Sequence, residues 1–130
     1  MKQLIFLTTL LSLRLIELPV CKDCPLETAK MIQQMLDHER FDNHRSSRRQ
    51  YYIQKNDLIP ANLDIEFGNK KILVTKADTG AVFKVKRLEN TEDGNPVLSL
   101  FLVNDNLDAW STFECQDGVW KMASFKYVVY

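Results

Sequence analysis

Two histidines and two aspartates occur within eight residues, in a set formed by Asp37, His38, Asp42 and His44. A carboxylate beside an imidazole can act as a general acid–base pair, and the same side chains can hold a metal ion weakly. On a helix, Asp37 and His38 would point about 100° apart, and of these histidine–aspartate pairs only His38 and Asp42 have i,i+4 spacing. The neighbouring residues are polar, so we interpret the set as a solvated helix end and keep catalysis as the alternative.

A second group of residues could bind an anion or a partner protein. Basic residues outnumber acidic ones between positions 40 and 55, where Asp42 is the single acid. Guanidinium groups near aromatic rings are typical of anion sites and protein interfaces. The candidate binding residues are Arg45, Arg48, Arg49 and Tyr52, together with Trp110, which could line the concave face of a strongly curved sheet if it is not simply part of the core.

The alternative for these arginines is pairing with carboxylates of the same domain. The chain has 17 basic and 17 acidic residues, but the neutral total conceals an uneven distribution. Seven acids and no basic residue lie between Leu88 and Trp120, namely Glu89, Glu92, Asp93, Asp105, Asp108, Glu114 and Asp117. Because this acidic half would repel phosphate, we expect no nucleic-acid partner.

The three cysteines, Cys21, Cys24 and Cys115, are too few for a disulfide scaffold. Cys21 and Cys24 form a C-x-x-C pair, but the chain after it favours hairpins over the βαβ unit of redox proteins. A zinc site would need further ligands at matched spacing, so we expect neither a metal nor another cofactor. If Cys21 carries a lipid, Cys24 and Cys115 are left to form one disulfide; otherwise one thiol stays free.

The first twenty residues resemble a targeting segment. A positive start at Lys2 precedes an apolar run over residues 4–13, which is the order of a secretory signal peptide and too short to span a bilayer. Arg14, Glu17 and the lack of a small-x-small cleavage site depart from that pattern. The stretch that ends at Cys21 stands where a bacterial lipoprotein would be acylated. We expect an extracytoplasmic protein, attached to a membrane only through its N-terminus if at all, with a cytoplasmic domain as the alternative.

Residues 21–130 suffice for one domain. The composition, 45% hydrophobic and 26% charged, excludes a disordered chain and a multi-span membrane protein. Apolar residues recur at helical spacing from Leu26 to Leu36, which predicts a helix over 25–40 with Gln33 and Gln34 on its solvent face. A second short helix is the best fit for residues 40–55.

From Leu63 onward the apolar period changes to two, which indicates strands. Expected strands cover 63–67, 70–74, 81–89, 97–103, 107–116 and 119 almost to the terminus. Gly68-Asn69 and Asp117-Gly118 are hairpin turns. The second turn would pair Cys115 with Trp120, Glu114 with Lys121, Phe113 with Met122 and Trp110 with Phe125, all sensible cross-strand neighbours. The expected fold is α+β, with one or two N-terminal helices packed on a curved antiparallel sheet of five to six strands.

The strands over 98–103 and 110–115, the turn Gln116-Asp117-Gly118 and Trp120-Lys121 resemble the closing strands of nuclear transport factor 2-like and cystatin-like domains. Enzymes of the first group place an acid, often with a histidine, inside a cone, which would implicate the set at 37–44. That fold usually has a third helix before the long strands, and none is expected between Lys76 and Ala81. A simpler cystatin-like layout is equally compatible.

The resemblance implies a fold more than a function. We expect a non-catalytic, exported binding or accessory module of the cell envelope, a monomer or homodimer, whose ligand is a protein or a small molecule. The first alternative is a small isomerase-like or hydratase-like enzyme with an acid–histidine pair. The second is a cytosolic inhibitor or immunity-type protein whose acidic strands meet a basic target.

Overall fold

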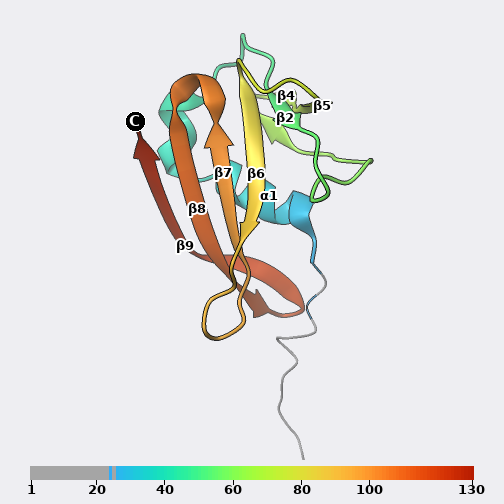
Figure 1. The fold of residues 1–130 in the computed structure, drawn as a ribbon, viewed down its shortest axis with the longest axis vertical. Helices are drawn as coiled ribbons and strands as arrows, with labels where there is room; N and C mark the ends of the chain where they lie inside the picture. The colour runs from blue at the N-terminus through green and yellow to red at the C-terminus, as the bar shows by residue number, and fades with distance from the viewer. Residues whose placement is uncertain (1–23, 25) are drawn as a thin grey trace, which may run out of the picture.

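A computed structural model describes Cys24 and residues 26–130 and shows an α+β chain with one main helix and a six-stranded mixed sheet (Figure 1). The expected targeting segment over residues 1–20 and the expected lipidation site Cys21 lie outside the described residues. Within the described part of the chain, no helix is long and apolar enough to cross a bilayer.

The helix α1 spans Thr28–Leu36 and is shorter than expected. Its apolar stripe is buried, as the spacing predicts, with Met31, Ile32, Met35 and Leu36 almost inaccessible to solvent. The chain then forms the 3-10 helix η4, Glu39–His44, in place of the second helix expected over 40–55. The rest of that stretch was assigned wrongly, because the β-favouring run Tyr51-Tyr52-Ile53 enters the sheet as strand β2, Tyr52–Gln54.

The strands lie in the order β5-β2-β6-β7-β8-β9. Their bounds are β5 Leu73–Thr75, β6 Val82–Leu88, β7 Val97–Leu102, β8 Leu107–Gln116 and β9 Val119–Val129, with the 3-10 helix η5, Val103–Asp105, before β8. From β6 to β9 the pairing is antiparallel as expected, but β2 is parallel to both of its neighbours. The prediction of a wholly antiparallel sheet was therefore wrong.

The two hairpin turns are where the sequence places them. β3, Glu66–Phe67, and β4, Lys70–Lys71, form a separate hairpin in which Glu66 faces Lys71 and Phe67 faces Lys70. Gly68 and Asn69 both have positive φ, at 65° and 66°, as a tight two-residue hairpin loop requires.

The β8–β9 register agrees with the expected one only near the turn. Cys115–Trp120, Glu114–Lys121 and Phe113–Met122 face each other as predicted. A β-bulge between Thr112 and Phe113 then shifts the register, so that Trp110 faces Lys126 instead of Phe125. A bulge adds one residue without a distinctive sequence signal, so the register expected from the sequence did not include it.

One face of the sheet carries the core and the other is open. α1, η4 and the β3–β4 hairpin pack on the first face, where Phe41 and Phe67 join Phe83 in edge-to-face contacts. In Figure 1, α1 passes behind the sheet, and the face toward the viewer carries no helix. Along β8 the burial alternates strictly, with Ala109 and Phe113 inaccessible and Trp110 half-buried between them on the open face.

Two side-chain amides attach α1 to the backbone of the strands. Gln34 Nε2 donates to the Trp120 carbonyl and Gln34 Oε1 accepts from the Met122 N–H, both at 2.8 Å. Gln33 does the same with the N–H and carbonyl of Glu66, at 2.8 and 3.0 Å. Both glutamines were expected in solvent, and that expectation was wrong, because each amide takes the place of a neighbouring strand at an exposed backbone edge.

A disulfide joins Cys24, just before α1, to Cys115 on β8. The two Cα atoms are 6.0 Å apart, and 91 positions separate the cysteines in the sequence. The bond links the segment before α1 to the C-terminal end of β8. The helix is therefore attached to the sheet at its beginning as well as through its glutamines.

Replacement of Gln34 by alanine should lower the free energy of unfolding by about 1–2 kcal/mol, since two hydrogen bonds to β9 are lost. Urea denaturation measures the change. Lys30→Ala is the matched control on the same helix, where the exposed ion pair with Glu27 should contribute less than about 0.5 kcal/mol. Equal losses of unfolding free energy in the two variants would show that Gln34 does not attach the helix to β9.

Candidate functional site

The four candidate acid–base residues are separated by the structure into different local contacts. The exposed Asp37 accepts a hydrogen bond from Gln33 Nε2 at 2.9 Å, and Asp42 forms an ion pair with Arg45. His38 caps η4 by accepting the Arg40 N–H, and its ring stacks on Phe125 with centroids 3.9 Å apart. Each of these side chains is thus engaged in holding local structure.

His44 lies apart from the other three and bridges two 3-10 helices. Its Nδ1 is 2.8 Å from Asp105 Oδ2, and both side chains are mostly buried. The backbone carbonyl of His44 accepts a hydrogen bond from the Tyr51 hydroxyl. Burial is the main reason that the pKa of Tyr51 is raised above its ordinary value, and the Asp105 charge acts in the same direction while Arg49 opposes it.

The three arginine candidates make different contacts. Arg45 donates to the carbonyls of Leu36 and His38 at 2.6 and 3.1 Å, so it binds the otherwise unpaired end of α1. Arg49 lies 6.0 Å from the centre of the buried Tyr51 ring. Arg48 is exposed on the same loop, and its backbone N–H bonds to the Ser46 hydroxyl.

Tyr52 and Trp110 lie on the open face of the sheet. Tyr52 is on β2 and Trp110 on β8, with β6 and β7 between them. The structure therefore divides the expected binding residues between the loop after η4 and the open face of the sheet.

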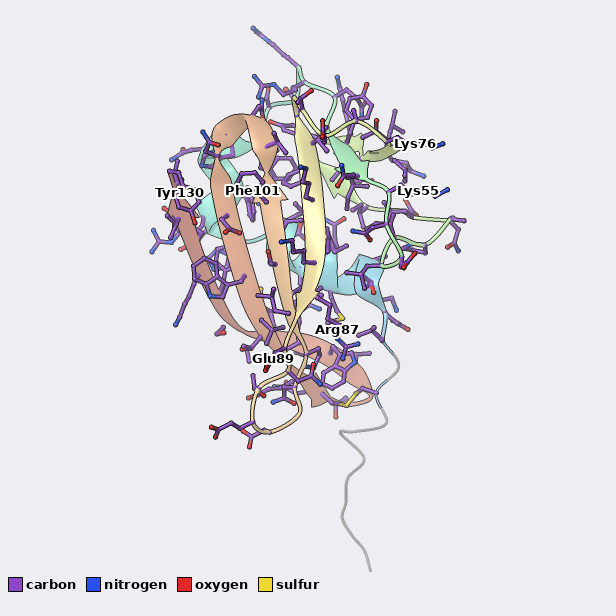
Figure 2. All side chains as sticks on the ribbon, in the orientation of Figure 1. Lys55, Lys76, Arg87, Glu89, Phe101 and Tyr130 are labelled. Carbon is purple, nitrogen blue, oxygen red and sulfur yellow. A yellow bond between two sulfur atoms is a disulfide. The ribbon has the colours of Figure 1, made fainter. Side chains whose placement is uncertain are left out.

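The open face brings together residues that the sequence analysis did not connect. We call them the open-face cluster: Lys84, Lys86, Ser99, Phe101, Asp108, Trp110 and Lys126. The strand pairing arranges them in two adjacent rows, Lys86–Ser99–Trp110–Lys126 and Lys84–Phe101–Asp108, across β6 to β9. Phe101 and Trp110 are only partly buried, and Figure 2 labels Phe101 over this part of the sheet.

The net charge of this cluster is positive. Among the described residues, no carboxylate lies within ion-pair distance of Lys84, Lys86 or Lys126. Asp108 is the one acid of the cluster, against three lysines. Neighbouring strands are about 4.8 Å apart, so the lysines lie within reach of any group that rests on the two rings.

The sequence does contain a signal for the open-face cluster. Lys84 and Lys86 alternate with the buried Phe83 and Val85, and Trp110 alternates with Ala109 and Ser111. The period of two therefore assigns the lysines and Trp110 to the face away from the core. Only the register between strands, which includes the bulge, shows that they are neighbours.

Two hollows lie on the other side of the molecule. One of about 660 Å³ is polar and is lined by Asp37, Asp64 and Glu66 with Arg45. The other, of about 360 Å³, lies between α1 and β9 against Met31 and Trp120. No group of three or more His, Cys, Asp or Glu side chains in the described part of the chain is arranged to hold a metal ion.

The raised pKa of Tyr51 predicts an alkaline loss of stability. The neutral hydroxyl donates to His44, so its stabilisation is complete below about pH 10 and is lost as the pH rises through the higher folded-state pKa. Tyr51→Phe should cost about 1 kcal/mol at neutral pH. In urea denaturation, the difference in free energy of unfolding between Tyr51→Phe and wild type should narrow above pH 10. Tyr52→Phe is the control, in which no such narrowing is expected. A difference that stays constant would contradict the assignment.

No protein-family model, curated protein or solved structure matches the chain. The resemblance to nuclear transport factor 2-like and cystatin-like domains therefore remains an expectation from the sequence.

Proposed function

We propose that the protein is a non-catalytic binding module whose binding surface is the open-face cluster. The observation that carries this proposal is a pair of only partly buried aromatic residues, Phe101 and Trp110, flanked by three lysines that have no carboxylate partner among the described residues. Aromatic rings at a surface that also offers charge are typical of interaction sites.

The contacts of the acid–base candidates support binding over catalysis. Asp42 neutralises Arg45 at the end of α1, His38 caps η4, and His44 pairs with Asp105. A general base must reach a substrate proton with its own lone pair. None of these three side chains lines either of the two hollows described above.

The chemistry of the cluster favours an acidic polypeptide segment as the partner. Lysine ammonium groups bind carboxylates as point charges, while the two ring faces offer apolar contact to side chains between the carboxylates. The rows of the cluster run across the strands, so an extended segment could follow them. Asp108 would repel such a segment locally, which makes it a useful position for a test.

Export of the module remains part of this proposal. The positive start and apolar run over residues 4–13 support a cell-envelope or secreted location, and so does the disulfide between Cys24 and Cys115, because such bonds persist in oxidising compartments.

Binding can be measured by fluorescence anisotropy of a labelled peptide that alternates glutamate with leucine. Lys86→Glu and Trp110→Ala should each weaken binding about tenfold, through charge reversal and loss of the ring contact. Asp108→Asn should strengthen it. Lys76→Glu is the matched control, because Lys76 is exposed and lies toward the β5 edge, away from Phe101 (Figure 2).

Three outcomes would overturn the proposed surface. The first is an equal loss of peptide affinity in Lys76→Glu and Lys86→Glu. The second is an unchanged affinity in Trp110→Ala. The third is an unchanged affinity when glutamine replaces glutamate in the peptide. Tighter binding of single-stranded oligothymidine than of the acidic peptide would identify a nucleic-acid partner instead.

The intact mass of the protein from its native host tests export separately. We expect the loss of about twenty residues, with or without a lipid on Cys21. Reduction should add two daltons for one disulfide. A full-length mass with three free thiols would contradict export and favour the cytosolic alternative.

A further inference from the structure

The outer edge of β9 is a second candidate interaction site, next to the open-face cluster, with which it shares Lys126. β9 is eleven residues long and forms one border of the sheet (Figure 1). Unpaired strand edges of this length are templates for pairing with another strand, and natural proteins usually block them. In this chain the block is partial.

Gln34 covers only the first part of this edge. Its amide occupies the outward backbone groups of Trp120 and Met122. The Tyr130 N–H donates to the Asn106 carbonyl, on the side of β8. Because the backbone groups of successive strand residues point in opposite directions, those of Phe125, Tyr127 and Val129 point away from β8. No backbone partner for these outward groups lies within the described residues.

The side chains along the free edge suit a second copy of the same chain. In an antiparallel pair centred on Tyr127, Phe125 would face Val129 of the second copy, and Lys126 would face Val128. A pair centred on Lys126 would set two lysines opposite each other, which is unfavourable. In the Tyr127-centred register, three pairs form between residues whose backbone groups point away from β8, and each pair exchanges two backbone hydrogen bonds. The paired segment ends before the part of β9 that Gln34 covers.

Exposed apolar surface lies at the same place. Val128, Val129 and Tyr130 are 39%, 51% and 75% exposed, and they follow one another at the end of the edge. In the Tyr127-centred register, Val129 would be covered by Phe125 of the second copy, which is itself only partly buried. Pairing would therefore remove apolar area from water as well as satisfy backbone groups.

We infer that two copies of this chain associate through the outer edges of their β9 strands, antiparallel about a two-fold axis at Tyr127, and join their sheets into one. Such an interface is isologous, as in most homodimers. It is also small, and interfaces below about 1,200 Å² are typical of weak complexes, so the dimer should dissociate reversibly on dilution.

Sedimentation equilibrium of the protein as isolated from its host, from micromolar to millimolar concentration, tests the inference. In Val128→Glu, the new carboxylate of each copy would face Lys126 of the other, which gives two such pairs in the dimer. The dissociation constant of the dimer should fall about two- to thirtyfold. Val128→Lys should weaken the dimer by a similar factor. Within one chain Val128 faces Asp108, so the two variants should rank in the opposite order for monomer stability.

A backbone variant separates pairing from side-chain effects. Val129→Pro removes an N–H that points out of the sheet, a position where an edge strand tolerates proline, and should abolish the dimer without loss of the cooperative unfolding transition. Val129→Ala keeps the N–H and should weaken the dimer less. A monomer at every concentration, or a shift in the same direction for Val128→Glu and Val128→Lys, would overturn the inference.

Discussion

The arrangement of this molecule depends on the bidentate contact of two adjacent glutamines with strand backbone. A nine-residue helix is not stable by itself in water, and α1 has no side-chain cap at its start. Gln33 binds one edge of the small hairpin and Gln34 binds the edge of β9, so the helix is held between two strand edges. Its apolar stripe is thereby fixed over Phe41 and the sheet core.

The same contact decides which surfaces remain free. Because α1 lies on one face, Phe101, Trp110 and the three lysines on the other face stay accessible. Because the amide of Gln34 reaches no further than Met122, the outer edge of β9 beyond it has no backbone hydrogen-bond partner in the described part of the chain. The open face and the free edge are two consequences of where a single helix was attached.

The positions of β6 to β9 and of the hairpin turns could be predicted from the sequence, whereas β2 and the longer-range pairing could not. The expected strand 70–74 divides into β4 and β5, which belong to different sheets. The Asp117-Gly118 turn and alternation fixed three cross-strand pairs correctly, because a two-residue loop leaves one register. The bulge at Thr112 and the parallel placement of β2 between β5 and β6 depend on tertiary packing. Glutamine in a helix normally indicates solvent, so no pattern could reveal that Gln34 meets β9.

The candidate residues show the same limit. The spacing argument placed Asp37 and His38 on one helix, but α1 ends at Leu36 and both residues lie beyond it. Spacing also could not show that Arg45 binds the carbonyls at the end of α1. The alternation of β6 placed Lys84 and Lys86 on one face, but Phe101 lies in the almost wholly apolar run of β7, where no alternation can be seen. Their proximity follows only from the β6–β7 register. Surface chemistry that is assembled across strands is invisible until the register is known.

The bond between Cys24 and Cys115 has a further consequence for the chain outside its core. The exposed loop between β6 and β7, around Glu92 and Asp93, lies between the two cysteines in the sequence. A protease that cut this loop would therefore leave both pieces covalently joined and still paired in the sheet. The fold can thus survive a nick that would separate an unbridged chain into fragments.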